Sequence, residues 1–380
     1  MKKIFIILSL VGFFFIFLLS CKAPSLKIGI ILPVEGPAAI YGKSALKGAK
    51  IAFEENEDKK FFGKNVEIVI EDNRGLPDRT KEIMTSFGED KEVLCVIGPA
   101  ISKNAFVSAT ISQKYSLPVI SPTATHPLVT KIGDFVFRVT FTDSVQGAVL
   151  AKFVYQNLKK RKAAILYEAN DPYSEVLSRN FEIAFKNLGG EIAIAEFFMD
   201  KDDVFYSKLD KINSFNPEVL FLPVYANYVS LIIKQAVEIK FIPIFIGGDG
   251  WYSEDLINKN KDLFKKVKGY ISSPFTPDLP SKRVKEFVEK YREKYQENPD
   301  FASALTYDAV NIAYSILKRI EKSDRIEFAN RLKDFEFEGV TGKISFKKAK
   351  DPLKDVFILE VSPEGFKYFM TLHPEGNENF

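Results

Sequence analysis

The sequence predicts an α/β protein with two doubly wound, Rossmann-like lobes. Short apolar runs rich in β-branched residues alternate with segments of helical periodicity, which is typical of buried parallel strands covered by helices on both faces. This alternation runs from residue 26 to residue 121 and starts again at residue 163. A chain of 380 residues is long enough for two domains. We therefore expect one sheet in each lobe.

In the first series, the apolar positions of each segment separate strands from helices. Ala45, Leu46, Ala49 and Ala52 recur at helical spacing, and Pro77 suits the first turn of a helix. The predicted helices follow Tyr41 and cover Pro77–Phe87 and Ser102–Tyr115, and the predicted strands are Leu26–Val34, Val66–Glu71, Val93–Ile97 and Leu117–Ser121.

The second series repeats this pattern and ends with a long helical region. Its predicted strands are Ala163–Tyr167, Glu191–Phe198, Pro217–Val224 and Phe241–Ile246, with helices at Tyr173–Leu188 and Ala226–Lys240. Helical patterns dominate from Ser281 to Phe335, and strands at Val340–Phe346 and Val356–Val361 close the chain.

The N-terminus has the pattern of a secretory signal. Lys2 and Lys3 precede the apolar stretch Ile4–Leu19, which is followed by Ser20 and Cys21. The segment around Cys21 resembles the lipobox of bacterial lipoproteins, which implies a signal peptide over residues 1–20, a lipid on Cys21 and a body anchored in the periplasm or at the cell surface. The alternative is a permanent membrane anchor, but the apolar stretch is shorter than the ~20 residues that span a bilayer.

Composition and motifs argue against several other classes of function. The 53 basic and 50 acidic side chains nearly balance, so we expect no nucleic-acid partner. The only histidines are His126 and His373, and no P-loop, nucleophile elbow or His-Glu-x-x-His motif is present. We therefore expect no metal, no cofactor and no enzyme activity; a hydrolase that uses carboxylates has no motif to support it. Cys95, inside an apolar run, is expected to be a buried thiol.

Polar and aromatic side chains follow the predicted strands where a ligand would bind. In open α/β sheets, ligands bind beyond the carboxyl ends of the strands. Ser102 is expected to cap a helix whose N–H groups suit a carboxylate, and the loop after Ser121 adds hydroxyl and N–H donors. The second series contributes a carboxylate and phenols, so the set suits a zwitterion. The candidate residues are Ser102, Thr123, Ala124 and Thr125 in the first lobe and Tyr173, Tyr225 and Asp249 in the second.

Three segments resemble the branched-chain amino-acid binding proteins of ABC importers, which have the type I periplasmic-binding fold. They are Gly36–Gly42 (Gly-Pro-Ala-Ala-Ile-Tyr-Gly), Val96–Gly98 and Ser121–Thr125. The resemblance implies that Asp249 pairs the ligand's ammonium, and that Tyr41 lies at the edge of the side-chain pocket. It also implies that Ser102, Thr123 and Thr125 hold the α-carboxylate together with backbone N–H groups, and that Tyr173 and Tyr225 close over the ligand.

The same resemblance implies how the lobes are joined and used. Lobe 1 would comprise residues 21–143 and 274–352, and lobe 2 residues 144–273 and 353–380. The crossovers would lie near Phe141–Ser144, Ser272–Phe275 and Ala349–Asp355. A monomer would close on an amino acid by hinge motion and deliver it to a membrane permease.

Two alternatives concern the ligand and the class of partner. Lys103 and Arg74 depart from the residues usual in the family; they either favour an acidic ligand or are solvated. An amide, urea or an aromatic acid could replace the amino acid as ligand. A protein-binding regulatory lipoprotein of the same fold would need no carboxylate–ammonium pair across the cleft.

Overall fold

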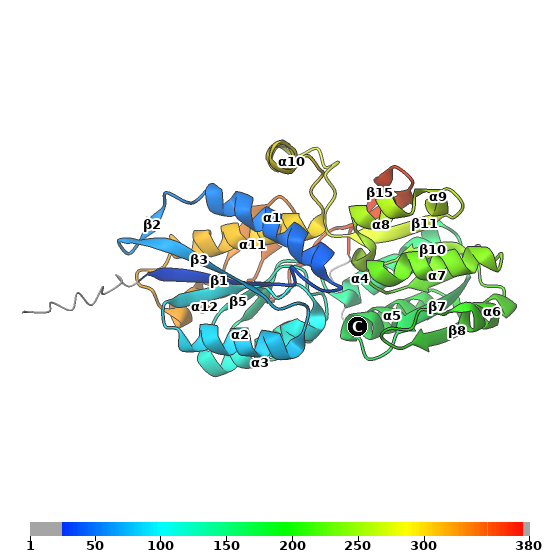
Figure 1. Cartoon of the computed structure of the whole chain (residues 1–380), viewed down its shortest axis with the longest axis horizontal. Helices are drawn as coiled ribbons and strands as arrows, with labels where there is room; N and C mark the ends of the chain where they lie inside the picture. Colours follow the sequence, from blue (N-terminus) through cyan, green and yellow to red (C-terminus); the bar gives the residue numbers. More distant parts are fainter. Residues whose placement is uncertain (1–24, 348, 375–380) are drawn as a thin grey trace, which may run out of the picture.

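The protein consists of two lobes, each built around one β-sheet with helices on both faces (Figure 1). The computed structural model describes residues 25–347 and 349–374. The predicted signal peptide and Cys21 lie outside the described residues. In the described part of the chain, no helix is long and apolar enough to cross a membrane.

Lobe 1 contains a six-stranded sheet in the order β2-β3-β1-β4-β5-β6. All of its strand pairs are parallel except β2–β3. Helices α1 and α11 pack together on one face, and α2 and α3 cover the other. The bounds are β1 Leu26–Leu32, α1 Ala39–Glu54, β2 Lys60–Phe61, β3 Lys64–Asp72, α2 Pro77–Glu89, β4 Val93–Ile97, α3 Ser102–Tyr115, β5 Val119–Ser121, β6 Val136–Arg138 and α11 Phe301–Leu317.

Lobe 2 contains a seven-stranded sheet in the order β15-β14-β11-β10-β9-β7-β8. Alternate residues of β7 face opposite layers: Ala163 and Ile165 pack with the α4–α5 side, and Ala164 and Leu166 with the α6–α7 side. The bounds are α4 Asp143–Lys152, β7 Lys162–Glu168, α5 Pro172–Asn187, β8 Glu191–Phe198, α6 Tyr206–Ser214, β9 Val219–Leu222, α7 Ala226–Glu238, β10 Ile244–Gly247, α8 Glu254–Lys259, α9 Lys261–Phe264, β11 Gly269–Ser273, β14 Val356–Ser362 and β15 Gly365–Leu372.

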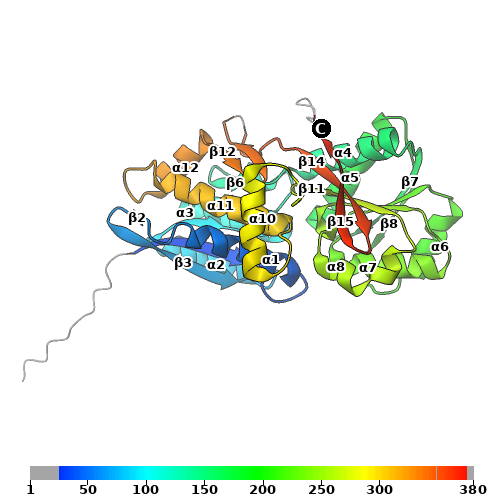
Figure 2. The same cartoon turned by 90° about the horizontal axis from the view of Figure 1, so that it is seen from above.

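The chain passes between the two sheets three times: after β6, after β11 and after β13. Figure 2 shows the helices between the second and third passages on lobe 1, and β14 and β15 on lobe 2. These lobe 1 elements are α10 Lys282–Tyr295, α12 Arg325–Lys333 and a hairpin of β12 Glu336–Gly339 and β13 Gly342–Ser345. The loops after β4 and β5 of lobe 1 and after β10 of lobe 2 meet at one cavity between the lobes.

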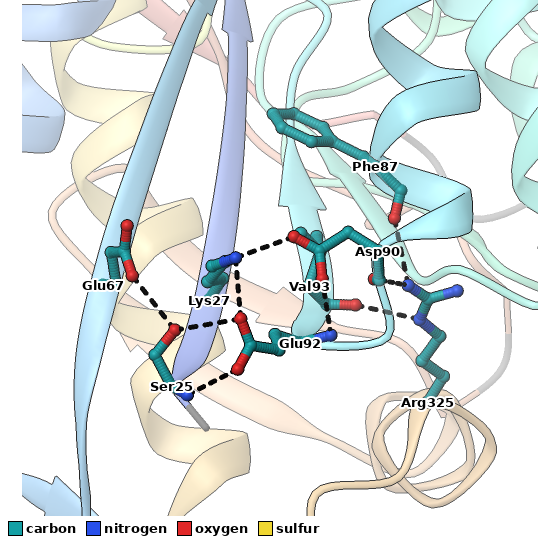
Figure 3. A network of polar contacts seen from close by, with 8 residues as sticks. All are labelled: Ser25, Lys27, Glu67, Phe87, Asp90, Glu92, Val93 and Arg325. Atoms are coloured by element: carbon teal, nitrogen blue, oxygen red, sulfur yellow. Dashed lines mark hydrogen bonds and ion pairs between the residues drawn. The ribbon is translucent and has the colours of Figure 1, made fainter. Parts of the chain in front are cut away.

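A polar network lies at the other end of the lobe 1 sheet, at the amino ends of its strands (Figure 3). Lys27 lies 2.8 Å from a carboxylate oxygen of both Asp90 and Glu92. Arg325 donates hydrogen bonds to five main-chain carbonyls, those of Phe87, Gly88, Asp90, Val93 and Tyr115. These contacts fix the amino ends of β1 and β4, far from the strand ends that face lobe 2.

The predicted fold class is confirmed, and β4, α3 and β8 have the predicted bounds. The lobe 2 sheet is less parallel than expected, since β14 pairs antiparallel with both β11 and β15. Several elements were not predicted from the sequence: strands β2, β6, β11, β12 and β15 and helices α4, α6, α8 and α9. Cys95 is a buried free thiol in β4, as expected.

Candidate functional site

A cavity lies between the lobes at the carboxyl ends of the parallel strands. All eight residues predicted from the sequence to contact a ligand line it. The empty space between the lining residues is about 320 Å³, but a sphere the size of a water molecule can be centred in only about 20 Å³ of it. The site is therefore nearly closed in this arrangement. The lining residues are Tyr41, Ala100, Ile101, Ser102, Thr123, Ala124, Thr125, Tyr173, Tyr225, Asp249, Gly250 and Phe301.

On lobe 1, the segment after β4 brings the start of α3 to the cavity. Gly98 has φ +111°, and a Cβ there would lie 2.1 Å from the carbonyl oxygen of Ile31, so only glycine fits this turn. The expectation that Ser102 caps α3 is wrong: Ile101 is the N-cap residue and Ser102 is the first helical residue. The Ser102 hydroxyl instead accepts a hydrogen bond from the His126 N–H at 3.3 Å.

The loop after β5 presents its backbone to the same space. The Thr123 hydroxyl donates to the carbonyl of Ala100 at 2.5 Å, so it ties the two loops together. Among the described residues, nothing accepts a hydrogen bond from the main-chain N–H groups of Ser102, Thr123, Ala124 or Thr125. Free N–H groups at a helix N-terminus and in an adjoining loop form a ready site for an anionic oxygen.

On lobe 2, Asp249 follows β10 and is 4% exposed. Its Oδ1 accepts a hydrogen bond from the Tyr173 hydroxyl at 3.1 Å, and its main-chain N–H donates to Gln146 Oε1 at 2.8 Å. Burial raises the pKa of Asp249 to about 6, against the hydrogen bonds from Gln146 and Tyr173. A buried carboxylate of this kind is stabilised by a cation.

A second buried carboxylate, Asp143, lies beside Asp249. Its Oδ1 accepts from Gln146 Nε2 at 3.2 Å, and its Oδ2 has no hydrogen-bond partner among the described residues. Burial, and then the charge of Asp249, raise the pKa of Asp143. Gln146 connects both acids and also accepts from the Ser272 hydroxyl at 2.7 Å. Asp143 does not line the cavity itself, so a second acidic group lies behind the cavity wall near Asp249.

Aromatic rings form the rest of the cavity wall. Tyr173 and Tyr225 stack with ring centroids 4.9 Å apart, and Tyr41 lies 5.8 Å from Tyr225 and 6.3 Å from Phe301. The Tyr41 hydroxyl donates to the carbonyl of Gly250 and accepts from the Ala226 N–H at 3.1 Å, so it bridges the lobes. Burial raises the pKa of all three tyrosines, which keeps their hydroxyls neutral.

The two basic residues left open by the sequence do not line the cavity. Arg74 is exposed and lies 3.1 Å from Glu35. Lys103 is exposed; burial raises the pKa of Asp171, which belongs to lobe 2, and the charge of Lys103 opposes that rise. Arg74 is therefore solvated, and Lys103 lies at the rim, facing lobe 2.

The sequence analysis missed several residues of the site. Phe301 reaches it from the start of α11, where the N-cap residue Asp300 was the only local signal. Asp143 and Gln146 belong to α4, which the apolar pattern did not reveal. In residues 25–347 and 349–374, no group of three or more His, Cys, Asp or Glu side chains could hold a metal ion.

Comparison with known proteins agrees with this geometry. The model of the periplasmic binding protein family matches residues 25–366. A leucine-, isoleucine-, valine-, threonine- and alanine-binding protein of Pseudomonas aeruginosa is 24% identical over 87% of this chain and 88% of its own.

Two solved structures share both the fold and the extent of the chain. A leucine-binding protein of Thermotoga maritima superposes with a TM-score of 0.87 and 30% identity, covering 92% of this chain and 99% of its own. A branched-chain amino acid transporter substrate-binding protein of Streptococcus pneumoniae, solved with isoleucine, gives a TM-score of 0.84 and 28% identity, covering 92% and 100%. Because the family model spans nearly all the described residues, the chain belongs to the periplasmic binding protein family.

Proposed function

We propose that this protein is the solute-binding component of an ABC importer and captures an aliphatic amino acid between its two lobes. The observation that carries the proposal is the opposition of two chemistries across one cavity. Lobe 1 offers main-chain N–H groups that have no acceptor in the part of the chain that the structure describes, and lobe 2 offers the buried carboxylate of Asp249. A zwitterion satisfies both at once.

Each part of the ligand has a partner. The α-carboxylate would accept from the N–H groups of Ser102 and Thr125, both of which line the cavity. The ammonium would pair with Asp249, because a buried charge is stable only when it is paired and hydrogen-bonded. The side chain would lie against the rings of Tyr41 and Phe301, which suits an apolar group. The names of the relatives from Pseudomonas and Streptococcus support leucine, isoleucine or valine as the first ligands to test.

Binding would proceed by hinge closure. The cavity is nearly closed to the outside in this arrangement, so the lobes must separate to admit an amino acid. Contacts such as that of Tyr41 with Gly250 form only when the lobes meet, and a ligand that bridges them shifts the population toward the closed form. The proposed hinges are the crossovers near Phe141–Ser144, Ser272–Phe275 and Ala349–Asp355, with the lobe boundaries given above.

The cellular setting of the proposal rests on the N-terminal sequence and the family. A lipid on Cys21 would hold a monomer at the outer side of a membrane, next to the permease that accepts the ligand. Radiolabelled fatty acid should enter the wild-type protein expressed in bacteria but not the Cys21→Ser variant. A label in both proteins would contradict the anchor.

Thermal unfolding against a panel of ligands tests the proposed function. The protein should first be unfolded and refolded to remove any ligand that co-purifies. Leucine, isoleucine and valine should raise the melting temperature in a concentration-dependent way, because they bind the folded state only. Urea, acetamide and benzoate are the competing ligand classes. A shift with one of these and none with any amino acid would overturn the proposal.

A further inference from the structure

We propose that Arg138 is a positioning residue that sets the geometry of the ligand-binding loop and ties it to the third crossover. Arg138 ends β6, and its charged side chain is fully buried. A buried guanidinium needs partners for its N–H groups. Those partners belong to the loop after β5 and to the segment that leads to lobe 2. The inference rests on the proposed function, since it concerns how the loop is prepared for a ligand.

The first contact is with the backbone of the loop. Arg138 Nη1 donates to the carbonyls of Ala124 and His126, both at 2.9 Å. In a trans peptide the carbonyl and the following N–H point in opposite directions. Because the Ala124 carbonyl points to Arg138, the N–H of Thr125 points away from it. That N–H is one of the donors that have no protein partner among the described residues. Arg138 thereby sets the direction of a donor proposed to hold the ligand's carboxylate.

The second contact is with the crossover between β13 and β14. Arg138 Nε donates to Asp351 Oδ1 at 2.8 Å, and the Arg138 main-chain N–H donates to the carbonyl of Lys350 at 3.1 Å. The Thr130 hydroxyl donates to the same carboxylate at 2.8 Å and accepts from Arg138 Nη2 at 3.3 Å. The guanidinium of Arg138 thus contacts both the loop around Thr125 and a proposed hinge. We therefore expect a structural change in one of these segments to alter the other.

The role proposed for Arg138 requires the planar guanidinium of arginine, which lysine lacks. Arg138→Lys keeps the positive charge but loses the planar fork that reaches two carbonyls and a carboxylate together. Asp351→Asn leaves the two carbonyl contacts in place and weakens the contact with the crossover. Arg325→Lys is the matched control, because Arg325 also binds main-chain carbonyls of lobe 1 but at the opposite end of the sheet (Figure 3).

The test compares leucine affinity by calorimetry, and the amide resonance of Thr125 by NMR without ligand, in the three variants. Arg138→Lys should weaken binding by at least about tenfold, as expected for the loss of hydrogen bonds to a charged group. It should also shift the Thr125 resonance. Arg325→Lys should lower the melting temperature while leaving affinity within about twofold and the resonance unchanged. Asp351→Asn should weaken binding less than Arg138→Lys and speed dissociation.

Two results would overturn the inference. One is an Arg138→Lys variant that binds leucine like the wild type with an unmoved Thr125 resonance. The other is equal loss of affinity in Arg138→Lys and Arg325→Lys, which would reflect general destabilisation. If Arg138→Lys does not fold, unchanged affinity and dissociation rate in Asp351→Asn overturn the link to the hinge. If the wild type binds no amino acid, the proposed function fails, and the Thr125 resonance still tests the positioning role.

Discussion

The hydroxyl of Tyr41, on lobe 1, donates a hydrogen bond to the main-chain carbonyl of Gly250, on lobe 2. The same oxygen accepts from the Ala226 N–H, so a single phenol closes one wall of the cavity. Gly250 follows Asp249 directly in the sequence. Under the proposed hinge closure, this contact would therefore form next to the carboxylate that pairs the ammonium.

Tyr41→Phe should weaken ligand binding mainly by faster dissociation. The variant keeps the ring against Tyr225 and Phe301 but loses the hydroxyl contacts between the lobes, worth about 0.5–1.5 kcal/mol each. Together the two contacts amount to about 1–3 kcal/mol, so stopped-flow measurements should show dissociation roughly 5- to 150-fold faster with little change in association. Tyr295→Phe is the control, because its hydroxyl donates to Lys47 within lobe 1. Equal rates in wild type and Tyr41→Phe would remove the bridge from the closing mechanism.

Asp249→Asn should have the largest effect of any single change in the cavity. The substitution keeps the shape of the side chain and removes the charge that pairs the ammonium, at a cost of about 2–5 kcal/mol. Calorimetry should show affinity reduced by more than about tenfold. Asp255→Asn, an exposed change in the same lobe that loses only the pair with Lys259, should bind normally. Unchanged affinity in Asp249→Asn would exclude this residue from the site.

Ligand affinity should fall as the pH is lowered through about 6. Burial raises the pKa of Asp249 to about 6, and an ammonium pairs only with the ionised form, so binding at lower pH must release a proton. The loss should approach tenfold per pH unit below that value. Asp143 is the neighbouring titratable group: it contacts Gln146, which also binds the main chain of Asp249, and burial raises its pKa in the same direction.

The same pKa shift predicts how the ligand changes the pH dependence of stability. In the protein without ligand, the raised pKa means that the folded state holds this proton more tightly than the unfolded chain. The stability that Asp249 contributes is therefore full below the unfolded pKa and is lost as the pH rises through about 6. A bound ammonium opposes that loss. Calorimetric titration with leucine from about pH 8 to about pH 5 should show a proton release on binding that grows as the pH falls through about 6 in the wild type, and much less release in Asp249→Asn. Constant affinity over this range would contradict an ionised partner for the ammonium.

Thr125→Ala should weaken binding less than Asp249→Asn. The change removes the hydroxyl but leaves the main-chain N–H groups of the loop, which Arg138 continues to orient. A loss of about 0.5–1.5 kcal/mol, or roughly 2- to 10-fold in affinity, is expected from equilibrium titration. Thr110→Ala, an exposed change in α3, is the control. A loss as large as that of Asp249→Asn would show that the hydroxyl, rather than the backbone, holds the carboxylate.

The sequence was sufficient to predict the parts of the site that follow strands. Ser102, Thr125, Tyr173, Tyr225 and Asp249 each lie just beyond an apolar run, and the geometry of parallel sheets brings such positions to one edge. The positions of the strand ends were therefore enough to predict that these residues lie close together.

The remaining residues of the site are brought there by tertiary packing, which local sequence patterns do not predict. Phe301 reaches the cavity from a helix that follows the second passage between the lobes, and Gln146 is a buried amide in a helix without an apolar stripe. Arg138 ends the three-residue strand β6, which was not predicted, and its partner Asp351 is far away in the sequence. Ser102 was wrongly predicted to be the N-cap residue of α3. The N-cap residue is Ile101, one position earlier, and Ser102 is already the first residue of the helix.

The central claim is that one ligand presents a carboxylate to lobe 1 and an ammonium to Asp249. The most direct test is calorimetric titration of the refolded wild type with leucine, with 4-methylpentanoate, which lacks the ammonium, and with isopentylamine, which lacks the carboxylate. The account predicts that leucine binds and that both analogues bind at least about a hundredfold more weakly, because each leaves a buried polar group of the site unpaired. Binding of 4-methylpentanoate as tight as that of leucine would contradict it.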